Sequence, residues 1–119
     1  MHQNTSTEKS QPEFQRVELN VLDPHLDKSL MVSFNGESEL TCVSYNLAIK
    51  TILQEEGMQI FHQIGTSPSG SNEPGQHAWE IWTPTTKDHL TALFERIHLE
   101  AAKTHDSIAP FYSTPDQRT

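Results

Sequence analysis

Seven histidines and a single cysteine are the side chains of this chain that could carry chemistry. His62 and His77 form the pair of most interest, because they lie in two short strand-like runs on either side of a polar loop, 66–75. If Ile64 lies opposite His77, the two histidines are diagonal neighbours with backbones roughly 7–8 Å apart. They could then share a proton, a phosphate or a metal ion with a group from the loop. We interpret them as a candidate ligand-binding or pH-sensitive pair, since imidazoles titrate near neutrality; the alternative is two hydrogen-bonded structural histidines.

The other patterns for metal binding or catalysis are incomplete. The chain has no His-Glu-x-x-His or His-x-His motif, and Cys42 has no second cysteine with which to bind zinc. Glu95 and His98 form one Glu-x-x-His half-motif, whereas a two-metal site needs two halves and further glutamates. Cys42 is a candidate nucleophile because a thiol near the start of a helix can have a lowered pKa; a small packed side chain is the alternative. We expect no metal, no cofactor and no catalytic residue.

The spacing of apolar residues predicts the strands and helices that would position these side chains. The expected strands, with apolar side chains at alternate positions, cover 14–22, 29–34, 58–64 and 76–82. Spacings of three and four predict helices over 38–56 and 85–104, the first closed by Gly57. Residues 107–112 could form a short last strand, which Pro110 would confine to a sheet edge.

This order is similar to the ferredoxin-like split β-α-β-β-α(-β) plan, preceded by one extra N-terminal strand. We therefore predict an α+β two-layer sandwich, in which two helices cover one face of an antiparallel sheet. Residues 14–112 are expected to form the single domain, and the polar segments 1–13 and 113–119 to be disordered tails. Regulatory domains, acylphosphatase-like enzymes and RNA-recognition motifs share this plan, so it does not determine function.

The sheet face away from the helices is the most probable binding surface on this plan. Alternation places Ile60, Ile64, Trp79 and Ile81 in the core, and it leaves Met31, Phe61, Glu80 and Trp82 together on the open face. Burying a large apolar side chain is worth about 1.5–3 kcal/mol, so exposed aromatic residues need an explanation. The N-terminal segment could fold over them, a second copy of the chain could cover them, or a ligand or partner could bind there. A register error of one residue would invert the assignment.

The charge and composition of the chain limit its partners. The net charge is −8, with acidic residues spread along the chain and no lysine or arginine patch, so we expect no nucleic-acid partner. No apolar run approaches ~18 residues, so we expect no membrane span. A single cysteine excludes an intramolecular disulfide, and with no signal peptide after Met1 we predict a cytoplasmic protein.

The leading functional prediction is a non-enzymatic interaction or regulatory module that uses the open sheet face as a homodimer. One alternative is a small enzyme or metal site at the mouth of the hairpin, using His62, His77 and Cys42. Another is an acidic adaptor or inhibitor that docks on a larger protein, whose binding would depend strongly on salt.

Overall fold

The computed structural model describes residues 13–22, 30–65, 73–81 and 85–112, with the backbone alone for 60–65. Both predicted tails, 1–13 and 113–119, lie outside the described residues, except for Glu13. The chain is an α+β protein. In chain order its elements are β1 (Asn20–Leu22), β2 (Leu30–Gly36), α2 (Glu39–Glu55), β3 (Ile60–Gly65), β4 (Gly75–Ile81), α3 (Lys87–Ala92), α4 (Phe94–Ile108) and the 3-10 turn η1 (Ala109–Tyr112).

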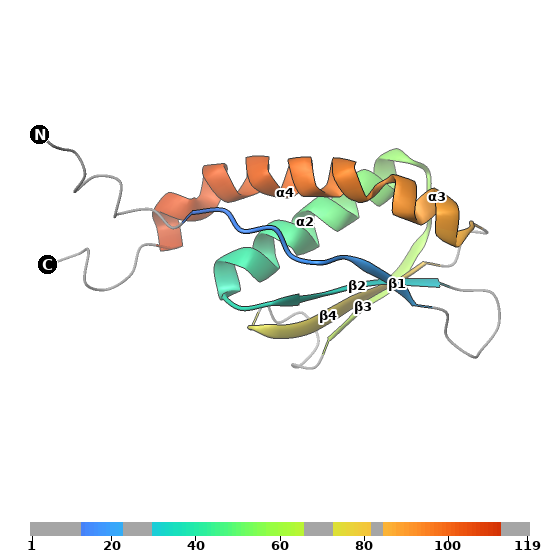
Figure 1. Cartoon of the computed structure of the whole chain (residues 1–119), viewed down its shortest axis with the longest axis horizontal. Helices are drawn as coiled ribbons and strands as arrows, with labels where there is room; N and C mark the ends of the chain where they lie inside the picture. The colour runs from blue at the N-terminus through green and yellow to red at the C-terminus, as the bar shows by residue number, and fades with distance from the viewer. Residues whose placement is uncertain (1–12, 23–29, 66–72, 82–84, 113–119) are drawn as a thin grey trace, which may run out of the picture.

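The strands form one antiparallel sheet in the order β1-β2-β4-β3. Since β2 and β3 are both antiparallel to β4, they run in the same direction with β4 between them, and α2 makes the crossover. The helices α2 and α4 lie on the same side of the sheet (Figure 1). The other side of the sheet has no described helix.

The helix α2 begins and ends where local chemistry predicts. The side chain of Ser38 accepts a hydrogen bond from the backbone N–H of Thr41, which caps the N-terminus. At the other end Gly57 has a φ of 77° and donates to Gln54, while Met58 donates to Leu53. This pair of bonds is the Schellman motif, which glycine favours because it lacks a Cβ. The predicted closing role of Gly57 is therefore confirmed.

The second predicted helix is longer than its spacing indicated, and it is divided in two. The hydroxyl of Thr86 caps α3, and α3 gives way to α4 at Leu93. The buried stripe continues in steps of four through Ala101, His105 and Ala109. The predicted strand over 107–112 is therefore wrong, because this segment completes α4 and the 3-10 turn. Pro110 does not prevent this, since proline is tolerated in the first turn of a helix.

The N-terminal segment is a strand only at its end. The predicted strand over 14–22 pairs with β2 through the three residues Asn20–Leu22 alone. Residues 13–19 leave the sheet and run between α4 and β2 (Figure 1). Their side chains reach the core, where Leu19 is buried, and Phe14 and Val17 pack against it.

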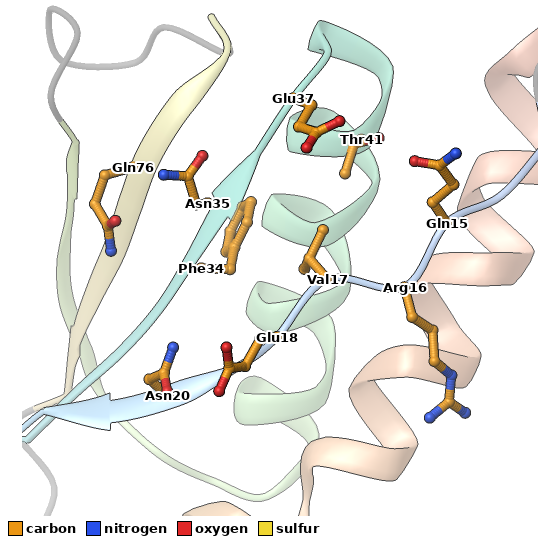
Figure 2. Close-up of a pocket in the computed structure, with 10 residues that line it drawn as sticks. All are labelled: Gln15, Arg16, Val17, Glu18, Asn20, Phe34, Asn35, Glu37, Thr41 and Gln76. Carbon is orange, nitrogen blue, oxygen red and sulfur yellow. The ribbon is translucent and has the colours of Figure 1, made fainter.

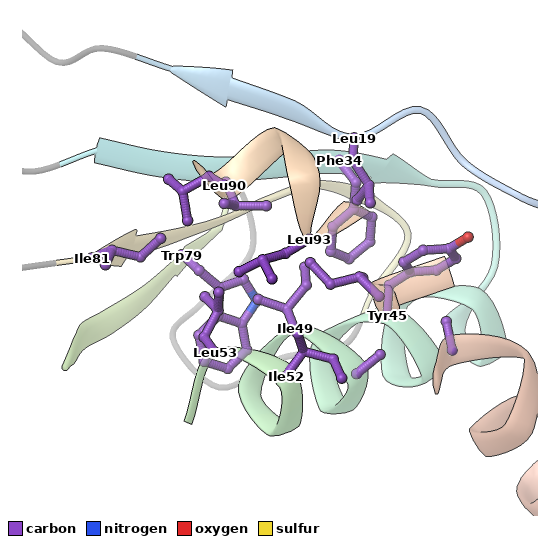
Figure 3. Close-up of a cluster of buried hydrophobic side chains, with 14 of the residues drawn as sticks. Leu19, Phe34, Tyr45, Ile49, Ile52, Leu53, Trp79, Ile81, Leu90 and Leu93 are labelled. Atoms are coloured by element: carbon purple, nitrogen blue, oxygen red, sulfur yellow. The ribbon is translucent and has the colours of Figure 1, made fainter. Parts of the chain in front are cut away.

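The core lies between the sheet and α2, with side chains from α3 and α4 completing it (Figure 3). Trp79 and Ile81 are buried there as predicted, and the indole N–H of Trp79 donates to the side chain of Asn46 at 2.9 Å. The apolar spacing that predicts the helix over 38–56 also places Leu47 on its buried face, but Leu47 is 46% exposed. The prediction is wrong at this position because α2 packs against both the sheet and α4, so its buried face includes Ser44 and Asn46 instead.

The contact between Gly36 and Cys42 leads to a stability prediction. A Cβ atom at Gly36 would lie 2.5 Å from the sulfur of Cys42, too close for any real contact. We expect Gly36→Ala to lower the free energy of unfolding by about 1–3 kcal/mol, as overpacked cores do. In a double-mutant cycle by urea denaturation, Cys42→Ala should recover most of that loss because it removes the sulfur. Additive effects of the two changes would contradict the contact.

Candidate functional site

The sheet face opposite the helices carries Leu22, Met31 and Glu80 in one row across three neighbouring strands. Their chain neighbours Val21 and Val32 face the core, so alternation directs this row to the other face. Leu22 is 42% exposed, while Met31 and Glu80 are half-buried. The structure thus brings Met31 and Glu80 side by side and adds Leu22, the last residue of the predicted strand 14–22, which the sequence analysis did not assign to this face.

The side chains of Phe61 and Trp82, the two aromatic residues assigned to this face, are not among those that the structure describes. Trp82 lies outside the described residues, and only the backbone of Phe61 is described. The ladder between β3 and β4 passes from Ile60 directly to His62, so Phe61 is the extra residue of a β-bulge. An extra residue inverts the alternation of those that follow it. The predicted face assignment along β3 therefore does not extend past the bulge.

The bulge also changes the predicted histidine pair. Gly65, and not Ile64, lies opposite His77. His62 lies opposite Glu80, which is three residues after His77 on β4. At ~3.3 Å per residue this is about 10 Å along the strand. The predicted diagonal register of His62 and His77 is therefore wrong.

His77 is held as a structural residue at the end of the hairpin. Its ring is buried and stacks on Phe34 with centroids 5.4 Å apart. Its Nε2 lies 2.8 Å from the backbone carbonyl of Glu73. Since a carbonyl only accepts hydrogen bonds, Nε2 carries a proton and donates it. The thiol of Cys42 also donates to this carbonyl, at 3.4 Å.

Cys42 and His77 therefore donate to the same carbonyl oxygen, and the thiol of Cys42 is not hydrogen-bonded to the imidazole of His77. Burial raises the pKa of the Cys42 thiol, which is the opposite of what a nucleophile at neutral pH needs. The structure instead bears out the alternative of a small packed side chain, because Cys42 is fully buried. Within the described ranges, no three histidine, cysteine, aspartate or glutamate side chains group closely enough to hold a metal ion.

Tyr45 is the centre of a polar cluster that the sequence did not reveal. Its hydroxyl lies 2.7 Å from Nδ1 of His98 and accepts a hydrogen bond from the backbone N–H of Val17 at 3.4 Å. Its ring stacks on Phe14 with centroids 5.9 Å apart. One helix side chain thus binds both α4 and the N-terminal segment. The residues are far apart in sequence, so no motif connects them.

The Glu-x-x-His half-motif on α4 has its two members engaged in this same attachment. Glu95 forms a bidentate ion pair with Arg16, with contacts of 2.7 and 3.2 Å. The guanidinium of Arg16 lowers the pKa of Glu95, and Glu95 raises the pKa of Arg16. The Nδ1 atom of His98 forms its hydrogen bond with the hydroxyl of Tyr45. These contacts fasten the segment 13–19 to the helix side of the domain.

This attachment bears on one of the three explanations offered for the open face. The N-terminal segment was one candidate cover for it. Its described residues from Glu13 to Leu19 pack on the helix side, through Phe14, Val17 and Leu19. Their polar anchor is the pair between Arg16 and α4. This part of the segment therefore does not cover the row of Leu22, Met31 and Glu80.

The cluster around Tyr45 predicts a pH dependence of stability. Burial, and next the charge of Arg16, lower the pKa of His98 from its ordinary 6.5, against an opposing effect of Glu95. The unfolded chain therefore binds this proton more readily than the folded chain. The contribution of His98 is present above pH 6.5 and is lost as the pH falls from there towards the lower folded pKa. Urea denaturation of wild type and His98→Gln on both sides of that pH should show a steeper loss for wild type; parallel losses would contradict the assignment.

A separate cavity of about 280 Å³ opens between the N-terminal segment and the edge of β2 (Figure 2). Its lining is mostly polar, with buried Phe34 and half-buried Val17 as apolar members. The complete lining is Gln15, Arg16, Val17, Glu18, Asn20, Phe34, Asn35, Glu37, Thr41 and Gln76. Sequence reasoning could not locate this cavity, because it exists only where residues 15–19 diverge from β2.

No protein-family model matches the chain, and comparison with curated proteins and with solved structures gave no match either. None of the helices in the described part is long and apolar enough to cross a membrane.

Proposed function

We propose that this protein is a non-enzymatic interaction module that binds a second copy of itself through the open face of its sheet. The observation that carries the proposal is the position of residues 13–19 on the helix side. These residues leave Leu22 exposed beside Met31, on a face that no described helix covers. Adjacent apolar side chains such as Leu22 and Met31 on a sheet face favour burial against another surface.

The hairpin mouth offers less support for an enzyme. Cys42 and His77 each have a hydrogen bond to the carbonyl of Glu73, and both are buried. Burial raises the pKa of the thiol, so it stays protonated at neutral pH. These contacts favour a structural role, in which two donors hold the chain at the start of β4.

We also propose that the fold is a variant of the ferredoxin-like plan with a displaced strand. The supporting observation is the strand order β1-β2-β4-β3, with a crossover helix between the parallel strands β2 and β3. In the ferredoxin-like plan a last strand, following the second helix, lies beside the first one. Here β1, from the N-terminus, lies in that place beside β2.

Sedimentation equilibrium of the wild-type chain over a wide concentration range tests the proposed self-association. We expect the mass to approach twice the 13.5 kDa of one chain as the concentration rises. Association through an apolar face should depend weakly on salt, whereas association through surface charges weakens as salt rises. A single-chain mass at every concentration would contradict the proposal.

A further inference from the structure

The edge of β2 that faces β1 is paired along the first part of the strand only. The ladder with β1 ends at the pair Asn20–Ser33, while β2 continues to Gly36. In the described residues, Phe34–Gly36 therefore have no ladder partner on this side, although β4 pairs with them on the other. The N-terminal segment diverges at this point, because its Val17 N–H is drawn to Tyr45 on α2. The result is a wedge between the two chains.

The cavity of about 280 Å³ occupies this wedge (Figure 2). Alternate backbone N–H and C=O groups of an unpaired strand edge point sideways, where an added strand can bind them. The free stretch of three residues, Phe34–Gly36, spans roughly 10 Å at ~3.4 Å per residue. This length and volume suit a few residues of extended chain.

The rim of the wedge is acidic. Glu18 and Glu37 line it and are exposed. Among the ion pairs formed between described residues, none includes either carboxylate. Arg16 also lines the cavity, but Glu95 already holds it at 2.7 Å. Glu37 and Glu18 lie towards opposite ends of the cavity (Figure 2), so a basic segment entering the wedge would meet a carboxylate near each end.

We propose that this wedge binds an extended basic peptide segment of a partner protein, which adds a short strand to the free edge of β2. Side chains alternate along a strand, so lysine or arginine side chains on one face of the peptide meet Glu18 and Glu37, while an apolar neighbour on the other face packs on half-buried Val17. This site is separate from the open sheet face, and it goes beyond the proposed self-association.

A titration of the full-length ¹⁵N-labelled protein with a short acetylated peptide of alternating valine and lysine tests the proposal. We expect saturable shifts of the backbone amides of Asn35, Gly36 and Glu18. The matched peptide with glutamate for lysine should bind at least about tenfold more weakly, because it places like charges together. A peptide methylated at alternate backbone nitrogens should also lose binding, since it cannot complete the ladder.

A matched pair of variants separates specific recognition from general acidity. Glu18→Gln with Glu37→Gln should weaken binding of the lysine peptide about tenfold. Asp88→Asn with Asp106→Asn removes the same charge from exposed positions on α3 and α4, and should leave binding unchanged. Equal binding of the lysine and glutamate peptides would overturn the proposal. So would unchanged binding of the methylated peptide, or the same amide shifts with lysine amide alone, which would indicate a small-molecule site.

Discussion

Replacement of Tyr45 by alanine is expected to lower the free energy of unfolding by about 3–5 kcal/mol, the cost of removing a large aromatic side chain from a core. Tyr45 is fully buried, and its ring contacts those of Phe14, Phe34 and His98. Its ring centroid lies 5.9 Å from that of Phe14 and 5.5 Å from that of Phe34. Its loss should therefore also release the N-terminal segment from the helices.

The matched change Tyr45→Phe keeps the ring and removes only the hydroxyl. His98 Nδ1 and the N–H of Val17 would then lose their partner, at a cost of about 1–3 kcal/mol. Urea denaturation measures both losses, and hydrogen exchange of the amides from Gln15 to Leu19 reports release of the segment. If Tyr45→Ala cost no more than Tyr45→Phe, the ring would not be the centre of this attachment.

Leu22→Glu is expected to abolish self-association at concentrations where the wild type is dimeric. Burying a leucine is worth about 1.5–3 kcal/mol, and a buried unpaired carboxylate is far more costly. Each copy carries the change, so the association constant should fall by at least about a hundredfold. Sedimentation equilibrium measures this directly. The fold should survive, because Leu22 lies outside the core cluster.

Leu99→Glu on α4 is the matched control for that variant. Leu99 is 56% exposed, similar to the 42% of Leu22, but it lies on the helix side of the domain. The same substitution there should leave the dimer intact. If Leu99→Glu dissociated the dimer and Leu22→Glu did not, the interface would lie on the helices instead of the sheet.

Apolar spacing and turn residues predicted those features of the fold that depend on residues close together in the sequence. Gly57 closes α2 as predicted, and Leu90, Leu93 and Ile97 are buried at the helical spacing that predicts the second helix. Trp79 lies in the core as alternation predicts. Each of these features depends on residues a few positions apart, which is the range that spacing can report.

The features that define the candidate sites depend on distant contacts. The bulge after Ile60 leaves no mark in the apolar alternation, yet it shifts His62 by one position in the ladder. The segment before β1 alternates like a strand, but Tyr45 and Glu95 hold it away from the sheet. Its divergence creates the cavity beside β2 and leaves the opposite sheet face without this cover.

The position of the dimer interface is tested most directly by intermolecular contacts of the Met31 methyl group. A sample that mixes chains labelled with ¹³C at the methionine methyl with unlabelled chains allows contacts between copies to be observed selectively. We predict intermolecular nuclear Overhauser effects from the methyl of Met31 to Leu22 or its sheet neighbours, and none from buried Met58. Intermolecular contacts that avoid Met31 in a sample shown to be dimeric, or none at all, would contradict self-association through the open sheet face.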